Sequence, residues 1–173
     1  MGNLIVSLDR WDRSLHHALI LRRRPLLDWV MRWLSRVCDP PVVLLWGSVL
    51  LAGMSPLPAE MARRGALSLL LSFLFVQLVK RRISRPRPTH PVGLQSLLAA
   101  PDHFSFPSGH AAAGLALVLP ALLALPILLA SSLLVLGLLI GVSRCYLGVH
   151  YPGDVAAGWW IAILTEILLR WMI

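Results

Sequence analysis

The first part of the chain spaces its apolar residues with the period of a helix. In residues 3–21, Leu4 and Trp11 belong to a series of apolar side chains three or four positions apart, and the charged residues fall largely elsewhere. After a break at residues 22–25, residues 26–37 resume the pattern. This spacing predicts amphipathic helices, which suit either the lipid head-group layer or a polar-faced position packed on a helix bundle.

The rest of the chain contains apolar stretches that predict membrane-spanning helices. These stretches cover residues 42–54, 66–79, 111–125, 126–142 and 155–169. The first would form about 20 Å of helix, so it crosses a bilayer only with help from its flanks or by local thinning. We therefore expect an all-α fold, a polytopic membrane helix bundle of about five spans preceded by interfacial amphipathic helices.

The same pattern predicts a single membrane-embedded domain over residues 1–173. Residues 1–39 would form the interfacial helices and residues 40–173 the transmembrane bundle, with a pair of prolines at the boundary. Residues 85–106 form a long connection that contains prolines and a short apolar patch. A loop of this length in a compact protein usually has a function.

Composition supports a membrane protein. The chain is 57% hydrophobic and its mean hydropathy is +0.74, values typical of polytopic membrane proteins. Its net charge of +8 comes from basic residues that flank the apolar stretches, which favours anionic lipid head groups over nucleic acid as partners. Cys38 and Cys145 lack the spacing of a metal site, so we expect reduced packing residues. Charges inside the first stretch argue against a cleavable signal peptide.

Three polar motifs stand at the ends of apolar stretches. They are Lys80-x6-Arg87-Pro88, Pro107-Ser108-Gly109-His110 and Ser143-Arg144-x5-His150-x3-Asp154. One span ends at the first motif, the next leaves from the second, another returns to the third, and the last leaves again. Because each span crosses the bilayer once, the order of the spans predicts that all three motifs meet at one membrane face.

The first motif, taken alone, has a plain structural explanation. Basic residues beside a span usually anchor it at the interface, and we interpret Arg81, Arg82 and Arg85 in this way. The same explanation fits Lys80 and Arg87 when they are considered by themselves. Their position relative to the other two motifs, and not their charge, favours a role in binding an anion.

The other two motifs also allow a structural and a chemical interpretation. Ser108 can cap a helix whose free N–H groups, with Gly109 allowing close approach, would bind an anion; the alternative is an ordinary cap followed by an interfacial His110. Asp154 lies four positions after His150. A carboxylate bonded to one ring nitrogen leaves the other with an exposed lone pair; the alternative is an interfacial ion pair with a structural histidine.

In combination, the three motifs resemble those of the type 2 phosphatidic acid phosphatase superfamily. The resemblance covers roughly residues 80–154 and implies a bundle of about six helices that dephosphorylates lipid phosphates without a metal or other cofactor. His150 would be the nucleophile and form a phosphohistidine, Asp154 would orient it, and His110 would protonate the leaving oxygen and then activate water. The phosphoryl oxygens would be held by Lys80, Arg87, Ser108, Gly109 and Arg144.

Several alternatives stay open at this point. The enzyme would be a hydrolase or a phosphotransferase, and a protein that binds or translocates lipid phosphates without catalysis is the alternative from another class. His103, in the loop 85–106, would contact the substrate or be solvated. Phosphatidic acid, phosphatidylglycerol phosphate, a polyisoprenyl diphosphate and lipid A 1-phosphate all suit the motifs. The lipid and the oligomeric state are therefore left open.

The distribution of basic residues bears on orientation. The span order places Arg63, Arg64 and Arg170 on the face away from the motifs and the other thirteen of the sixteen on the motif face. The positive-inside rule would then put the motifs in the cytoplasm. The family resemblance instead implies a periplasmic or exterior site. We expect an integral protein of the bacterial cytoplasmic membrane with its active site facing the periplasm or exterior.

Overall fold

The computed structural model describes residues 2–90, 92–99 and 102–172, with side chains from residue 9 onward. The regular elements in these ranges are helices, which confirms the expected all-α class. They are α1 (Gly2–Leu21), α2 (Pro25–Arg36), α3 (Pro40–Leu51), α4 (Ala59–Ile83), α5 (Gly109–Val118), the short 3-10 helix η1 (Leu119–Ala121), α6 (Ile127–Tyr146) and α7 (Pro152–Met172). An isolated β-bridge between Pro86 and Phe104 joins the two ends of the loop between α4 and α5.

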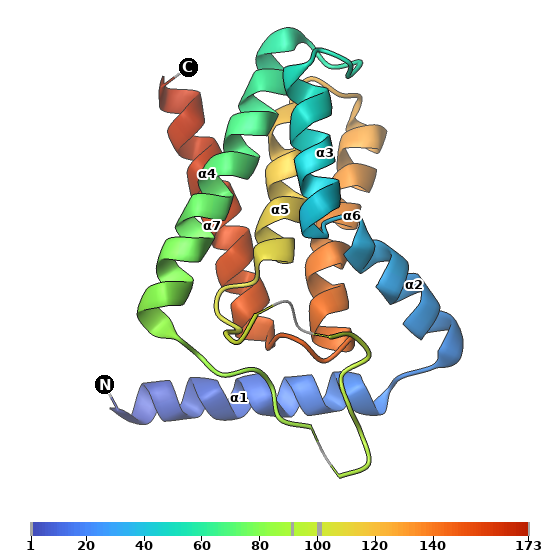
Figure 1. Cartoon of the computed structure of the whole chain (residues 1–173), viewed down its shortest axis with the longest axis vertical. Coiled ribbons are helices and arrows are strands. Elements are labelled where there is room, and N and C mark those ends of the chain that lie inside the picture. The colour runs from blue at the N-terminus through green and yellow to red at the C-terminus, as the bar shows by residue number, and fades with distance from the viewer. Residues whose placement is uncertain (1, 91, 100–101, 173) are drawn as a thin grey trace.

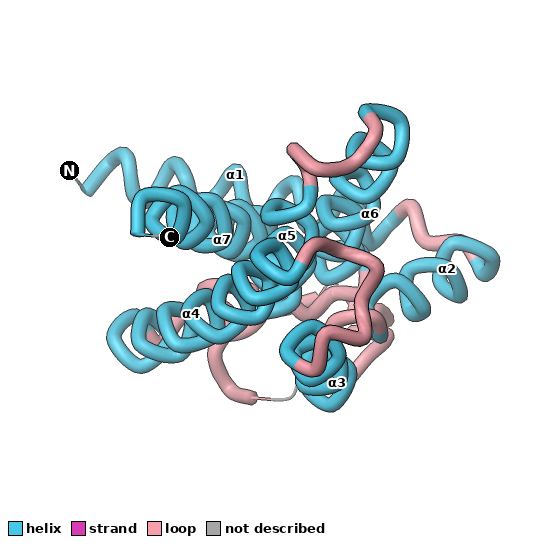
Figure 2. The backbone as a smooth tube through the Cα atoms, turned by 90° about the horizontal axis from the view of Figure 1, so that it is seen from above, coloured by secondary structure: helices cyan, strands magenta, loops and turns pink. Residues whose placement is uncertain are grey.

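α5 lies at the centre of the bundle, where it packs against α4, α6 and α7 (Figure 2). α1 lies across one end of the bundle and contacts α6 and α7 (Figure 1). α2 and α3 form a pair bent by 48°, in which α2 packs on α6 and α3 on α4. The last turns of α4 and α6 and the first turns of α5 and α7 therefore all lie toward α1.

Single residues explain where several of these helices begin and end. α2 and α3 each start at a proline, which suits the first helical position because its missing N–H would have no partner there. Ser108 caps α5 by accepting a hydrogen bond from the Ala111 N–H at 3.4 Å. α5 is shorter than the expected helix 111–125, because Pro120 has no N–H to donate and the chain tightens into η1 instead.

Within the described part of the chain, three helices, α4, α6 and α7, are long and apolar enough to cross a membrane. α2 and α3 meet that criterion only as a bent pair, and α5 with η1 forms a shorter apolar helix. Helix length thus supports three to four full crossings out of the expected five. Large apolar side chains such as Phe73, Leu128 and Trp160 are exposed on the outside of the three long helices, as expected for contact with lipid.

Glycines bring the central helix close to its neighbours. A Cβ atom on Gly137 of α6 would lie 2.9 Å from the backbone oxygen of Gly114 on α5, so neither helix has room for a side chain at this crossing. A Cβ on Gly158 of α7 would collide with the backbone oxygen of Ser108. The start of α5 is therefore held tightly against α7, next to the residues of the three motifs.

Candidate active site

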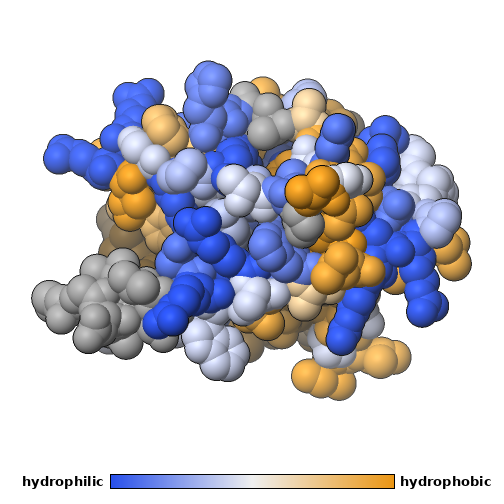
Figure 3. All heavy atoms as spheres, turned by 90° about the horizontal axis from the view of Figure 1, so that it is seen from below, coloured by the Kyte–Doolittle hydropathy of each residue, from blue (hydrophilic) through white to orange (hydrophobic). Residues whose placement is uncertain are grey.

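The three motifs meet at the end of the bundle that faces α1. Lys80 lies in the last turn of α4 and Arg144 in that of α6, whereas His110 and Asp154 lie in the first turns of α5 and α7. These four side chains and His150 are all buried despite their polarity. Seen from the α1 side, hydrophilic residues cover much of the surface above them (Figure 3). Such a concentration of buried polar groups at one end of the bundle is typical of a functional site.

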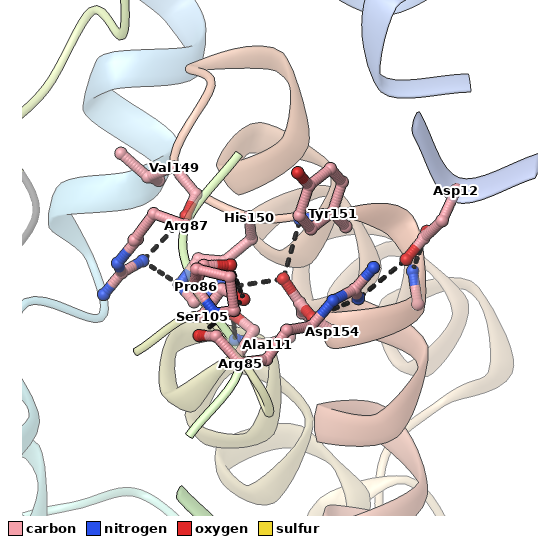
Figure 4. A network of polar contacts seen from close by, with 12 residues as sticks. Asp12, Arg85, Pro86, Arg87, Ser105, Ala111, Val149, His150, Tyr151 and Asp154 are labelled. Carbon is pink, nitrogen blue, oxygen red and sulfur yellow. Dashed lines mark hydrogen bonds and ion pairs between the residues drawn. The ribbon is translucent and has the colours of Figure 1, made fainter. Parts of the chain in front are cut away.

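His150 stands between a cation and a carboxylate (Figure 4). Its Nε2 lies 3.0 Å from Nη1 of Arg87, and its Nδ1 lies 3.6 Å from Oδ2 of Asp154, which is an ion-pair distance but too long for a hydrogen bond. Burial lowers the pKa of His150 to about 4, and the guanidinium groups of Arg87 and Arg144 act in the same direction against Asp154. The imidazole is therefore neutral near pH 7, as a nitrogen nucleophile must be.

Asp154 is fully buried and held by two further groups. Its Oδ2 accepts a hydrogen bond from the Tyr151 N–H at 2.8 Å, and its Oδ1 accepts one from Arg85 at 2.8 Å. The N–H of Ser108 donates to its backbone oxygen at 2.9 Å, which joins the starts of α5 and α7. Our interpretation of Arg85 as an interfacial anchor is wrong, because its guanidinium lies inside this network.

Lys80 and Arg87 together hold an anion in the form of the Asp102 carboxylate. The ammonium of Lys80 lies 2.5 Å from Oδ2 of Asp102, and Arg87 binds Oδ1 of the same carboxylate. Burial alone would raise the pKa of Asp102, but Lys80 and Arg87 outweigh it and keep that pKa below its ordinary value. His103, the next residue, is exposed on the same loop. Asp102 carries no recognisable spacing in the sequence, and its position as a lone acid in a basic loop is the signal that could have identified it.

A cavity of about 400 Å³ opens beside His110 and Arg144. It is lined by residues from the corner between α2 and α3, from the loop between α4 and α5, and from the second and third motifs: Ser35, Arg36, Asp39, Pro40, Pro41, Leu98, Ala99, His110 and Arg144. Nε2 of His110 lies 2.9 Å from Oδ1 of Asp39, and Nη1 of Arg144 donates to the Ser35 hydroxyl at 2.5 Å. Nε of Arg144 is buried without a hydrogen-bond partner in the described structure. In the sequence, Asp39 merely precedes the pair of prolines at the boundary between residues 1–39 and 40–173, and its partner could not be read there.

Packing does not require the glycine at position 109. A Cβ atom there would meet Val76 at 3.7 Å, an ordinary contact distance. Gly109 is the first residue of α5, where backbone N–H groups have no partner inside the helix and the helix dipole is positive. The start of α5 at Ser108 and Gly109 therefore presents free N–H groups and the positive end of the helix dipole, features that suit an anion. Among the residues that the structure describes, no three His, Cys, Asp or Glu side chains are grouped to hold a metal ion.

Comparison with known proteins places this site in a family. The sequence model of the PAP2 superfamily matches residues 63–173, which contain all three motifs. The chain belongs to the PAP2 superfamily. Together with the apolar helices, this makes it an integral membrane protein. α1, α2 and α3 precede the PAP2 match, so Ser35 and Asp39 come from a part of the chain that the family model does not cover.

Three relatives illustrate the range of the PAP2 similarity. Decaprenylphosphoryl-5-phosphoribose phosphatase of Mycobacterium tuberculosis is 40% identical over 85 residues, which span 47% of this chain and only 44% of that protein. Phosphatidylglycerophosphatase B of Bacillus subtilis is 30% identical over 92% of this chain and 81% of its own length. The crystal structure of Aquifex aeolicus LpxE superposes with a TM-score of 0.76 at 27% identity, covering 90% of this chain and 92% of that one.

Proposed function

We propose that this protein is a phosphatase that hydrolyses a phosphomonoester or diphosphate of a membrane lipid. One observation carries the proposal: the neutral imidazole of His150 lies beside Arg87, which together with Lys80 binds an anionic carboxylate. A nucleophile is thus adjacent to a site that suits a phosphoryl group. The phosphatase activities named for its PAP2 relatives support the same reaction class.

In the proposed first step, a substrate phosphate replaces the Asp102 carboxylate between Lys80 and Arg87. Arg87, which donates to Nε2 of His150 in this structure, turns its donor to the phosphate and frees the nitrogen lone pair. That lone pair attacks phosphorus while the bond from phosphorus to the lipid oxygen breaks. The bonding electrons stay on the lipid oxygen, and His110 protonates it so that the lipid leaves. The product on the enzyme is a phosphohistidine.

In the second step, His110 takes a proton from water while the water oxygen attacks phosphorus. The bond between nitrogen and phosphorus breaks, its electrons return to His150, and inorganic phosphate leaves. Asp154 stabilises the positive charge that the imidazole carries in between. Arg144, with its unused Nε donor, and the helix start at Ser108 and Gly109 bind the phosphoryl oxygens as charge moves onto them.

The cavity beside His110 supports a lipid as the leaving group. It lies on the side of the proposed acid, at the corner between α2 and α3, and its lining combines Leu98 and two prolines with Arg36 and Asp39. This mixture suits the junction between a polar head group and apolar chains. Phosphatidic acid, phosphatidylglycerol phosphate, a polyisoprenyl diphosphate and lipid A 1-phosphate are the candidates within this class.

The test is phosphate release by the purified full-length chain in detergent, measured with a panel of these four lipids. We expect release from at least one lipid and a loss of about a thousandfold or more in kcat for His150→Ala. Arg82→Gln, an exposed change on α4, serves as the control and should remain active. Retention of near wild-type activity by His150→Ala would rule out the proposed nucleophile.

A second measurement separates the hydrolase from its alternatives. Protein mixed rapidly with radiolabelled substrate and quenched in alkali should retain label, and His150→Ala should not. Transfer of label to an added alcohol in preference to water would favour a phosphotransferase. Substrate binding without any phosphate release would favour a protein that only binds or translocates lipid phosphates.

We further propose that the chain forms one domain in the bacterial cytoplasmic membrane, with residues 1–39 at the interface and the active site facing the periplasm or exterior. The exposed Trp11 and Leu15 on α1 and Trp29 and Trp33 on α2 support an interfacial position, because tryptophan is enriched at the level of the head groups. The crosswise position of α1 at the end of the bundle supports the same placement (Figure 1).

A further inference from the structure

Arg85 pairs with three carboxylates from two helices. Its guanidinium lies 2.8 Å from Asp154 in α7, 2.7 Å from Asp12 in α1 and 3.2 Å from Asp9 in α1. It also stacks on the ring of Tyr151, 4.2 Å from the ring centroid. Figure 4 shows Arg85 between Asp12 on one side and Asp154 on the other. A guanidinium with several fixed partners is an efficient means of holding a carboxylate in one orientation.

Asp12 has a second contact, with the start of α7. Its Oδ1 accepts a hydrogen bond from the N–H of Gly153 at 2.7 Å, and Gly153 immediately precedes Asp154. A Cβ atom on Gly153 would lie 2.9 Å from Oδ2 of Asp12, so the approach is close. Asp12 thus caps α7 from a different helix, and it holds the backbone at the position from which the Asp154 side chain extends.

These contacts determine the position of Asp154 relative to His150. The two side chains are 3.6 Å apart, so a small displacement of the carboxylate decides whether it bonds the imidazole. Asp154 is fully buried, and a buried carboxylate that loses its cation either takes up a proton or moves. Loss of Arg85 would also leave Asp9, Asp12 and Asp154 close together without their shared cation.

We propose that Arg85 and Asp12 are positioning residues for the His150–Asp154 pair, so that α1 is a part of the catalytic centre and does more than anchor the protein. The inference rests on the proposed function of His150 as nucleophile. α1 lies outside the residues matched by the PAP2 model. Among the described residues, the other charged or titratable groups near His150 include Arg87 from the loop, Arg144 from α6, His110 from α5 and His16 from α1.

The kinetic test compares Asp12→Ala, Asp12→Asn, Arg85→Gln and Arg85→Lys in the full-length chain. We expect Asp12→Ala and Arg85→Gln to lower kcat by about tenfold to a hundredfold with KM within about twofold, because they leave the phosphate-binding residues intact. Arg85→Lys should restore part of the loss by keeping the charge. Asp12→Asn should be intermediate, since it keeps an acceptor for Gly153. Asp9→Asn, at the longest and most exposed of the three contacts, is the matched control.

A double variant tests whether the two residues act together. If Asp12 works through Arg85, the Asp12→Asn/Arg85→Gln variant should lose little more activity than Arg85→Gln alone. Losses that multiply would overturn the proposal, because they would mean that the residues act independently. Unfolding temperatures, measured in parallel, distinguish a specific loss of activity from a general loss of folded protein. A general loss would lower the apparent kcat of every variant in proportion to its folded fraction.

The closing measurement does not depend on turnover. Nitrogen NMR of ring-labelled histidine reports the protonation and hydrogen bonding of each His150 nitrogen, with His150→Asn used for assignment. We expect the Nδ1 resonance of His150 to shift in Arg85→Gln and to stay at its wild-type position in Asp9→Asn. An unchanged resonance would overturn the positioning role even if the enzyme is a phosphatase. A shifted resonance in a protein that releases no phosphate would leave the positioning role standing and overturn the proposed function.

Discussion

At the residue scale, the site is governed by how its buried charges are compensated. Lys80 is paired with Asp102, and Asp154 with Arg85. Arg144 is almost completely buried, and its hydrogen-bond partner is the neutral hydroxyl of Ser35. Asp39 and Asp102 stabilise its charge, but no carboxylate of the described residues is in ion-pair contact with it. A phosphate that brings negative charge directly to this buried guanidinium would therefore be bound favourably. Arg144 is therefore better suited to bind the substrate than to anchor its helix at the interface.

Asp102 competes with the substrate for the same cations. We expect Asp102→Asn to lower the inhibition constants of inorganic phosphate and vanadate by about fivefold, the equivalent of roughly 1 kcal/mol, because the incoming anion no longer displaces a carboxylate. Inhibition of phosphate release measures this directly. His103→Gln, a change at the exposed neighbouring residue, is the control. Weaker inhibition would mean instead that Asp102 orients Lys80 and Arg87 for the substrate.

His16 links stability to pH. Its ring is completely buried, neither ring nitrogen has a hydrogen-bond partner among the described residues, and it stacks on His90 at 5.6 Å between ring centroids. Burial, with smaller effects from neighbouring His90, His17 and Arg23, lowers the pKa of His16 to about 4. Between about pH 6.5 and pH 4, His16 is therefore protonated in the unfolded chain but neutral in the folded chain. The free energy of unfolding consequently falls as the pH falls through that window.

Replacing His16 with an apolar ring should remove this dependence. We expect His16→Phe to lose less stability than the wild type between about pH 7 and about pH 5, by on the order of 1 kcal/mol. Thermal unfolding in detergent at both pH values provides the measurement, with the exposed His103→Ala as control. His150 has its pKa lowered in the same direction, so part of the slope should remain. If the free energy of unfolding depended on pH in the same way in His16→Phe, the His16 ring would not contribute to the pH dependence of stability.

The motif residues could be predicted from the sequence, whereas their partners could not. Lys80, Arg87, His150 and Asp154 stand at spacings that the order of the spans brings together. Partners such as Asp39, Asp102 and Arg85 are single charged residues in connections, and no spacing relates them to the groups they contact. These contacts depend on the conformation of the segments that connect the helices. Such segments have no hydrophobic periodicity from which their conformation could be predicted.

At the scale of helices, two glycines near the start of α5 have different roles. Gly158 is required by packing, because any side chain there collides with the backbone oxygen of Ser108. Gly109 has no such constraint, since its nearest neighbour would be Val76 at 3.7 Å. The two positions therefore offer a matched pair of substitutions, one acting on structure and the other on the proposed phosphate site.

We expect Gly158→Ala to lower the free energy of unfolding by about 1–3 kcal/mol, through displacement of α7 from α5. Gly109→Ala should leave the unfolding temperature unchanged or slightly raised, because alanine favours helix. It should nevertheless lower kcat/KM by about tenfold, since a methyl group would stand where phosphoryl oxygens approach the helix start. Normal turnover by Gly109→Ala would place the phosphate away from the N-terminus of α5.

Helix boundaries were predictable where a residue with a strong local preference determines them. Pro25, Pro40 and Ser108 each coincide with an observed helix start. The end of α5 was missed because Pro120 lies inside an apolar run, and hydrophobicity alone gives no sign of the break that the proline causes. The same limit explains the expected number of spans, since apolar length does not distinguish a crossing from a shorter helix enclosed by its neighbours.

At the scale of the whole molecule, contacts within the protein account for part of the uneven distribution of basic residues. Arg13 and Arg85 pair with carboxylates of α1, and Lys80 and Arg87 pair with Asp102. Arg23 donates to backbone oxygens. These side chains have structural partners on the motif face whichever way the protein is inserted. They therefore weaken the inference from the positive-inside rule, which concerns basic residues that retain the adjoining loop in the cytoplasm.

Orientation can be tested with one cysteine at each end of the bundle. Gln95 is exposed in the loop on the motif face, and Ala59 is exposed at the opposite end, at the start of α4. Both native cysteines are buried, so the wild type should react little with a membrane-impermeant maleimide. In intact spheroplasts, we expect Gln95→Cys to be labelled and Ala59→Cys to be labelled only after lysis. The reverse pattern would overturn the proposed orientation and place the reaction on lipids of the cytoplasmic leaflet, with the chemistry at His150 unaffected.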